Sequence, residues 1–302
     1  MNSANRHTTR TSTSLRLPAR APRLLLAAAL CSASLAAGAQ TAAAPEPAAP
    51  AATEASDLTI FTGLRLWSAN WDSPVPTRVL ALDPGTGAVV ARDANDRFSS
   101  SRIMPMPFIG LRYGNWIGSL AYTARTRFGT EGLLPDDVKR DELDLTVGYY
   151  VLPQLSLHLG YKQAKVDRIS PLVAGGSKTS GLLFGVSGSV PLAGSERLSL
   201  YGNFAYGLGR NKSDLPYANG DNKLDVSYRI GEVGLSYRLL AEPIGAIKQL
   251  SLSIGYRSQT VVFKKVPLGT YANMASTTPL SIQRRNAQST TDGIVVGLVG
   301  VF

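Results

Sequence analysis

Few residues in this chain have the type and spacing that catalysis or metal binding requires. The sequence holds two histidines, His7 and His158, and one cysteine, Cys31. His158 could act as a general base or as a metal ligand. His7 and Cys31 lie in a front segment that we expect to be removed, so His158 keeps no histidine or cysteine partner. We therefore interpret His158 as a hydrogen-bonding residue and expect no catalytic residue, no metal, no cofactor and no enzyme activity.

A larger group of charged residues recurs with a two-residue period, which places its members on one face of successive extended segments. If that face encloses an interior, two explanations are open. The charges could pair in an internal network that holds the interior shut, or the basic excess could line a narrow water-filled path that favours anions. The residues that share this face are Arg65, Arg112, Arg125, Arg127, Glu142, Asp144, His158, Lys162, Arg197, Arg229 and Arg257, with Ser156 nearby.

The elements that would position these residues are strands. In 141–151, Leu143, Leu145 and Val147 alternate with Glu142, Asp144 and Thr146, and period two indicates a strand with one apolar face. The same pattern recurs along the chain and predicts about ten strands. We expect them at 58–71, 103–113, 116–128, 141–151, 155–167, 179–190, 197–210, 223–239, 250–263 and 291–302.

The connections between these strands alternate in length. Short ones fall at 114–115, 153–154, 191–196 and 240–249, and longer ones at 72–102, 129–140, 168–178, 211–222 and 264–290. Such alternation predicts an up-and-down antiparallel barrel with both chain ends on one side. Within 223–239 the apolar parity changes between Ile230 and Val233, which predicts a β-bulge near Gly231 and Glu232.

The front of the chain has a different composition. Residues 1–39 combine a basic start, a short apolar run and Ala37-Gly38-Ala39, which predicts a cleaved signal peptide. Residues 40–56 are rich in Ala and Pro and are expected to form a disordered periplasmic linker before a barrel at 57–302. The front segment holds five of the 31 basic residues, so the rest carries 26 minus 21, or +5. This modest balance argues against a nucleic-acid partner.

The last strand carries a resemblance. It alternates Ile294, Val296 and Leu298 on one face and ends on Phe302. In this the chain resembles the outer-membrane β-barrels of Gram-negative bacteria as a class, although Gly300 stands where a larger apolar residue is usual. The resemblance implies a transmembrane barrel in the outer membrane, with Phe302 as the signal read by the barrel-assembly machinery.

Together these patterns predict a monomeric, non-catalytic outer-membrane barrel. It would act as a narrow porin-like channel, admitting small anionic solutes, or as a structural barrel with an arginine-rich lumen. The alternative is a cell-surface interaction or adhesion protein that uses the outer loops 72–102 and 264–290. We further hypothesise that four basic residues of the last loop contact phosphates of lipopolysaccharide in the surrounding outer-membrane lipid. These are Lys264, Lys265, Arg284 and Arg285.

Overall fold

The computed structural model describes residues 58–129, 137–169, 175–192, 194–240 and 242–302. The chain divides into two compact units, and the first, Met1–Ala36, lies wholly outside these residues. The expected signal peptide (1–39) and linker (40–56) also lie outside them and stay predictions. No helix in the described ranges is long and apolar enough to cross a membrane. The described residues all belong to the second unit, Ala37–Phe302.

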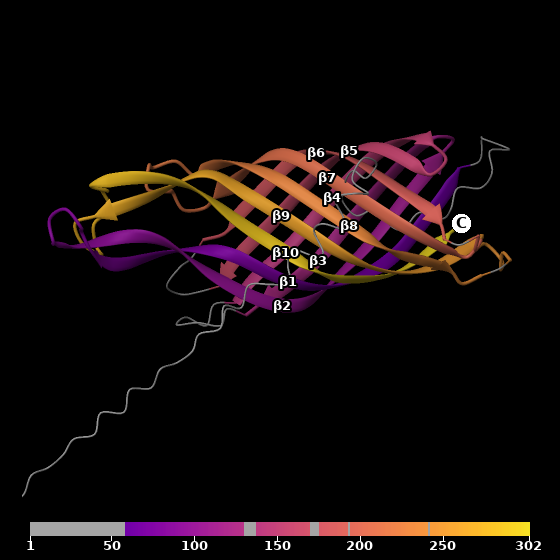
Figure 1. The fold of residues 1–302 in the computed structure, drawn as a ribbon, viewed down its shortest axis with the longest axis horizontal. Coiled ribbons are helices and arrows are strands. Elements are labelled where there is room, and N and C mark those ends of the chain that lie inside the picture. Colours follow the sequence, from indigo (N-terminus) through magenta and orange to yellow (C-terminus); the bar gives the residue numbers. More distant parts are fainter. Residues whose placement is uncertain (1–57, 130–136, 170–174, 193, 241) are drawn as a thin grey trace, which may run out of the picture. The chain divides into compact units, whose positions relative to one another are not determined.

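Ten antiparallel strands form one closed sheet (Figure 1). Each strand pairs with the next along the chain, and β1 pairs with β10, which closes the ring. The predicted all-β, up-and-down barrel of about ten strands is confirmed. The strands are β1 (Thr59–Leu82), β2 (Val89–Tyr113), β3 (Trp116–Phe128), β4 (Asp137–Leu152), β5 (Leu155–Ile169), β6 (Ser177–Pro191), β7 (Leu198–Ser213), β8 (Lys223–Arg238), β9 (Gln249–Tyr271) and β10 (Ser281–Val301).

Side chains alternate between the outer surface and the interior along each strand. In β4, Leu143, Leu145 and Val147 are exposed on the outside, whereas Glu142 and Asp144 are buried inside. Charged residues inside and apolar residues outside reverse the arrangement of a water-soluble protein. This surface suits a barrel that is surrounded by lipid.

The last strand closes the barrel as its sequence pattern predicts. β10 pairs with residues 61–72 of β1 without a break. The amide of Phe302 donates to the carbonyl of Ile60 at 2.8 Å, and the Phe302 side chain lies at the outer surface. The inner face of the seam is apolar and buried, through Val295, Val299 and Val301.

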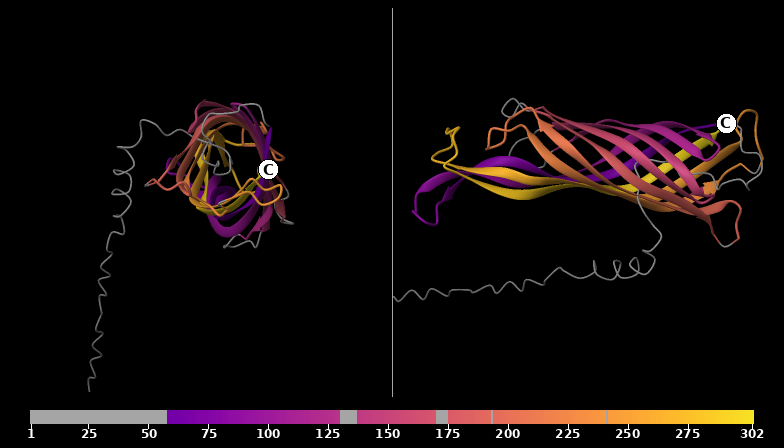
Figure 2. Two further views of the ribbon diagram at one scale, coloured as in Figure 1. Left: turned by 90° about the vertical axis from the view of Figure 1, so that its right-hand side faces the viewer. Right: turned by 90° about the horizontal axis from the view of Figure 1, so that it is seen from above.

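The two ends of the barrel differ. At one end, the turn end, short turns join β2 to β3 through Gly114 and Asn115 and β4 to β5 through Pro153 and Gln154. The chain also ends there (Figure 1). At the opposite end, the arm end, two hairpins extend well beyond the rest of the barrel (Figure 2).

The sequence predicts longer connections at 72–102 and 264–290 and, within the first, a hairpin of 77–82 and 88–92 that projects outside. That hairpin is confirmed, but the rest of both connections is wrong, because continuous strands replace them. β1 and β2 stay paired as far as Leu82 and Val89, and β9 and β10 as far as Thr270 and Ser281. β2 and β9 pair with each other at Arg92 and Thr270, so the two hairpins join into one sheet. We call these extensions, residues 73–99 and 264–289, the arm.

Two prolines obscure this continuity in the sequence. Pro74 and Pro76 interrupt the alternating pattern and predict a loop, because proline cannot donate to a strand ladder. In the structure β1 pairs with β10 only as far as Asp72, so beyond it β1 is an edge strand with β2 as its single neighbour. An edge strand tolerates proline.

The β-bulge predicted near Gly231 and Glu232 is also wrong, since β7 and β8 keep one register throughout β8. The apolar residues of the first half of β8 point into the barrel, where they pack with Leu183 and Ala205. The sequence pattern places them outside only because the whole interior is expected to be polar. These residues are Val226, Tyr228 and Ile230.

The ladder between β2 and β3 is short. It runs from Tyr113 beside Trp116 to Phe108 beside Ala121 and then stops. The next residues of β2 include Pro107 and Pro105, which have no amide hydrogen to donate. Beyond this point β3 stays paired with β4 and contains a bulge between Thr123 and Thr126.

Candidate functional site

Glu232 is the centre of one buried cluster inside the barrel. Its carboxylate forms an ion pair with Arg65 of β1 and a second with Arg257 of β9, whose Nη1 lies 3.2 Å from Oε2. The Tyr201 hydroxyl donates to Oε1 at 3.0 Å. The side chains of the three charged residues are at most 1% exposed. Four strands therefore converge on one carboxylate in the interior.

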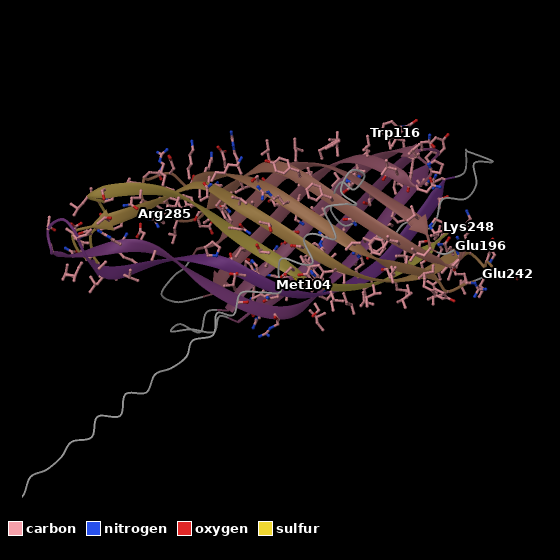
Figure 3. The ribbon with its side chains drawn as sticks, in the orientation of Figure 1. Met104, Trp116, Glu196, Glu242, Lys248 and Arg285 are labelled. Carbon is pink, nitrogen blue, oxygen red and sulfur yellow. The ribbon has the colours of Figure 1, made fainter. Side chains whose placement is uncertain are left out.

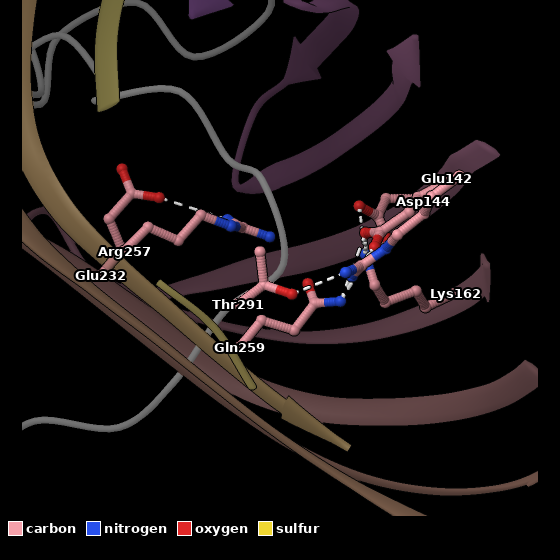
Figure 4. Close-up of polar contacts among 8 residues, drawn as sticks. Glu142, Asp144, Lys162, Glu232, Arg257, Gln259 and Thr291 are labelled. Atoms are coloured by element: carbon pink, nitrogen blue, oxygen red, sulfur yellow. Dashed lines mark hydrogen bonds and ion pairs between the residues drawn. The ribbon is translucent and has the colours of Figure 1, made fainter. Parts of the chain in front are cut away.

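A second cluster lies around Glu142 and Asp144 of β4 (Figure 4). Lys162 of β5 places Nζ 2.5 Å from Glu142 Oε2 and 2.9 Å from Asp144 Oδ1. From β9, Gln259 Nε2 donates to Glu142 Oε1 at 3.1 Å. Arg140 forms an ion pair with Glu142 as well. Each carboxylate is thus compensated by a cation, as burial demands.

The second cluster spans the full width of the barrel. β4 and β9 are five positions apart in a ring of ten strands, so the bond between Gln259 and Glu142 joins opposite walls. Arg140 reaches in the same direction: its Nη1 donates to Thr291 Oγ1 of β10 at 2.6 Å, and its guanidinium lies 4.8 Å from the ring centre of Trp71. At this level the interior is bridged by side chains.

The wall formed by β1, β2, β3 and β10 is largely apolar on its inner face. Trp71 packs edge-on against Phe128 with ring centres 4.9 Å apart, and Trp67 lies beneath the Arg257 guanidinium at 5.2 Å. The cluster also buries Met104, Met106 and Phe108. The interior therefore has an extended apolar wall beside its charged clusters.

The fully buried charges are close to balanced, and Arg112 adds a partly buried cation near the turn end. Four buried cations face three buried carboxylates, a difference of 4 − 3, or +1. The sequence pattern instead predicts a strong basic excess, with eight basic residues and two acidic ones. The buried ions are Arg65, Arg140, Lys162 and Arg257, against Glu142, Asp144 and Glu232.

The structure places seven of the predicted lumen-lining residues inside the barrel. Six are buried: Arg65, Glu142, Asp144, His158, Lys162 and Arg257. The seventh, Arg112, lies near the turn end, where its guanidinium sits 4.4 Å from the ring centre of Tyr150. Among the described residues, no group of three or more His, Cys, Asp and Glu side chains is placed to hold a metal ion.

Four predicted lumen residues lie elsewhere. The bulge after Thr123 reverses the parity of β3, so Arg125 and Arg127 are exposed at the arm end, where Arg125 pairs with Asp167 of β5. Arg229 is exposed on the outer face because β8 has no bulge. Arg197 precedes β7 and is exposed at the turn end.

Sequence reasoning missed several residues that complete these clusters. Arg140 has the parity of Glu142 and Asp144 but falls in a predicted connection, since β4 begins earlier than expected. The inward position of Glu232 follows if the inward–outward alternation of side chains continues unbroken through β8. Trp67 and Trp71 have the parity of Arg65, which was a usable signal, whereas the inward-facing residues Tyr201 and Gln259 had no distinguishing mark.

The arm holds a smaller polar cluster, the clasp, made of Arg78, Asp93 and Tyr271. Asp93 pairs with Arg78 Nε at 3.2 Å and accepts from the Tyr271 hydroxyl at 3.0 Å. The Arg78 guanidinium stacks 3.6 Å from the centre of the Tyr271 ring. The clasp ties the β1–β2 hairpin to the β9–β10 hairpin. Partial burial, followed by the hydrogen bond to Asp93, raises the pKa of the Tyr271 hydroxyl.

The four basic residues proposed from the sequence to contact lipopolysaccharide gather at the base of the arm. The β9–β10 register shifts there, and Lys265 has a positive φ of 52° while its amide donates to Asn286 Oδ1 at 2.9 Å. Figure 3 marks Arg285 at this place. Lys264 follows Tyr256, an exposed aromatic residue of the outer surface, by eight positions, which is about 20 Å along the barrel axis.

A closed antiparallel barrel, apolar outside and charged inside, meets the requirements of a bilayer, because no strand edge is left unpaired along the closing seam. The fold is that of an outer-membrane β-barrel. A comparison with protein-family models gave no match, and neither did a comparison with curated proteins.

Three solved structures with a similar arrangement are distant from this barrel in sequence. The outer membrane protease OmpT from Escherichia coli is 14% identical over 81% of this chain and 97% of its own, with a TM-score of 0.45. The translocator domain of the autotransporter NalP from Neisseria meningitidis is 13% identical over 83% and 90%, at 0.39. A FadL homologue from Pseudomonas aeruginosa is 10% identical over 82% and 90%, at 0.31.

These comparisons correct one expectation. The sequence analysis predicts that the barrel is not an enzyme, and that prediction does not stand, because the similar structures include a protease. The similar structures also include a translocator domain.

Proposed function

We propose that the barrel is a closed anchor in the outer membrane and that the arm is an interaction surface that contacts partners outside the cell. This joins the structural barrel predicted from the sequence to its alternative, a cell-surface interaction or adhesion protein. The arm end would face outward, since barrels of this class have short periplasmic turns and longer extracellular connections.

The bridge between β4 and β9 is the main support for a closed barrel. Gln259 and Glu142 join opposite walls, and Arg140 and Trp71 occupy the space beside them. A passing solute would have to part these groups and leave a buried charge without its partner, at a cost of about 3–5 kcal/mol. An ion-pair network of this kind favours a packed interior over an open pore.

The construction of the arm supports its function as an interaction surface. It is a paired sheet held by the clasp, so it presents a defined shape. Its tip exposes apolar side chains, including Leu80, Leu82, Val89 and Leu280, each more than half exposed. Apolar residues gathered at an exposed tip are suited to contact a partner protein.

A narrow path for small anions is the second candidate, and one observation favours it. Several buried polar atoms inside the barrel have no hydrogen-bond partner among the described residues, including Arg65 Nη1, Tyr228 Oη and Gln259 Oε1. Such atoms are normally satisfied by water. A file of waters beside arginine side chains would favour anions.

Single-channel recording in planar bilayers separates the two candidates. The unmodified barrel should show no steady conductance, and the double variant Trp71→Ala, Gln259→Ala should conduct because it removes two of the bridging side chains. Steady anion-selective conductance by the unmodified barrel would support the narrow path and contradict the closed anchor.

The arm is tested separately in cells that display the protein. Replacing Leu80, Leu82 and Val89 by serine should reduce attachment between cells, because it removes the exposed apolar tip. A control variant with serine at Leu239 and Ile244, exposed apolar residues at the turn end, should attach normally. Equal attachment by both variants would contradict the arm as the acting surface.

A further inference from the structure

Four lysines stand side by side on the outer surface near the arm end. Lys165 of β5 pairs in register with Lys178 of β6, Lys178 with Lys212 of β7, and Lys212 with Lys223 of β8. All four are exposed. Side chains of directly paired residues share a face, so the four ammonium groups form one row across four adjacent strands, which we call the lysine row.

Such a row is unfavourable by itself. Neighbouring strands are about 4.8 Å apart, and like charges directly opposite each other destabilise a sheet. Nothing in the barrel wall requires lysine at these positions, since they lie on the outer face and are exposed. The repulsion therefore points to anions that are supplied from outside the chain.

The carboxylates near the row are mostly engaged elsewhere. Asp167 lies 3.3 Å from Lys165 Nζ but also pairs with Arg125. Asp225 lies 3.9 Å from Arg210, and Asp214 accepts the amide of Gly176 at 2.7 Å. Among the described residues, Lys178, Lys212 and Lys223 have no ion pair. Three adjacent cations thus face outward without a protein counter-charge.

Three lysines of the row lie just above the apolar band of the outer surface, and Lys223 lies beyond it, ten residues from Val233. Lys165, Lys178 and Lys212 are each four residues beyond an exposed apolar residue of their own strand, namely Tyr161, Leu182 and Leu208. Four residues of a tilted strand correspond to about 10 Å along the barrel axis. A lysine side chain can bend back over part of that distance, so its ammonium group reaches the level of lipid headgroups.

We propose that the lysine row binds the phosphate groups of a phosphorylated glycolipid in the outer leaflet. This inference rests on the orientation proposed above, with the arm end outside the cell. Several phosphates on one headgroup would neutralise several lysines at once. Because the strands tilt, the row climbs by about 3 Å per strand, which lets it meet phosphates at more than one height. Lys165, Lys178 and Lys212 stand four residues from the exposed apolar residues of their strands, whereas Lys264 at the base of the arm stands eight from Tyr256.

The test compares two variants that lose the same charge. One carries Lys165→Gln, Lys178→Gln, Lys212→Gln and Lys223→Gln, and the control carries Lys264→Gln, Lys265→Gln, Arg284→Gln and Arg285→Gln. Binding of fluorescent lipopolysaccharide to the full-length barrel in detergent is measured. A lysine near an anionic surface changes binding about fivefold, so the row variant should bind at least about a hundredfold more weakly. The control should stay within about twofold of the unmodified barrel.

Further measurements identify the bound group. Lipopolysaccharide stripped of phosphate should bind the unmodified barrel as weakly as the row variant binds the intact lipid. Inorganic pyrophosphate should compete only at far higher concentration than the lipid, and equal competition would overturn the lipid as the ligand. Equal loss in both variants, or none in the row variant, would overturn the site. If the row variant does not fold, the Lys→Arg version of all four positions must retain binding and a single Lys178→Gln must lose about fivefold.

Stability supplies a readout that a purely structural contribution would not give. Without lipopolysaccharide, the row variant should resist heat unfolding better than the unmodified barrel, because the repulsion is gone. With saturating lipopolysaccharide the order should reverse, because only the unmodified barrel gains from binding. An unchanged order would contradict the proposal.

Discussion

The barrel and its arm each contain a carboxylate that accepts a hydrogen bond from a tyrosine at 3.0 Å and pairs with arginine. In the interior, Glu232 and its arginines are at most 1% exposed, whereas in the arm Arg78 is 28% exposed and Asp93 18%. The chemistry is the same and the surroundings differ. In the interior a lost partner leaves a charge that water does not reach, but in the arm water replaces it. Burial should therefore decide what each cluster contributes.

The strongest test of this comparison is Glu232→Gln, which leaves Arg65 and Arg257 buried without their carboxylate. We expect a loss of about 3–5 kcal/mol in the free energy of unfolding. Guanidinium unfolding in detergent micelles, followed by tryptophan fluorescence, measures it. The control is Glu196→Gln at the exposed turn end (Figure 3), which should change stability by less than about 0.5 kcal/mol. Similar losses in both would refute the importance of burial.

A second interior change, Gln259→Ala, tests the bridge between opposite walls. Glu142 keeps Arg140 and Lys162, so only a hydrogen bond to a charged group is lost. The expected destabilisation is about 1.5–3 kcal/mol, smaller than for Glu232→Gln. The same unfolding assay applies, with Gln283→Ala in the exposed arm as the control. A neutral Gln259→Ala would show that the bridge contributes nothing to closure.

In the arm, Asp93→Asn should cost less than about 1 kcal/mol, because the ion pair with Arg78 is partly exposed. The effect should be local. Hydrogen exchange at the Gly269 amide, which donates to Asp93 Oδ2 at 2.9 Å, should accelerate while the barrel strands keep their protection. Loss of protection throughout the barrel would mean that arm and barrel unfold as one unit.

The smallest effect is expected from alkaline pH. The pKa of Tyr271 is raised in the folded arm. A group whose pKa rises on folding stabilises the fold below its unfolded value, which is about 10 for tyrosine, and this contribution is lost as pH rises through the folded value. Proteolysis of the arm should therefore become faster above about pH 10. Tyr271→Phe should lack this additional dependence, and an identical pH profile in both proteins would contradict the clasp.

The barrel could be predicted from the sequence because its signal is repeated. Ten segments with one apolar face, ending at Phe302, define strand number, closure and the inward position of Glu142 and Lys162. Because the two-residue period recurs in ten segments, it remains recognisable even if the pattern of one strand is ambiguous. The expectation that failed on comparison, absence of catalysis, rested on one lone histidine and on no repeated pattern.

The clusters could not be predicted in full, because parity carries no information once both faces of a strand are apolar. Trp67 and Met104 lie on an apolar inner wall, which the expectation of a polar lumen does not predict. The same expectation places Tyr228 on the outer face and so predicts a bulge that the structure lacks. The true bulge after Thr123 has no sequence mark and moves Arg125 outside. The partner of a charged residue depends on distances across the barrel, such as that from Arg65 to Glu232, and these require coordinates.

The short ladder between β2 and β3 determines how the molecule would respond to mechanical load. The arm is formed by the extended ends of β1, β2, β9 and β10, so a pull on a partner held by the arm enters the barrel through these four strands. They are joined to the remaining strands along β8–β9, paired through most of β8, and along β2–β3, paired only from Phe108 to Tyr113. Strain would concentrate at the second boundary. The strands should separate first beside Pro105 and Pro107, where the barrel wall has the fewest hydrogen bonds to share the force.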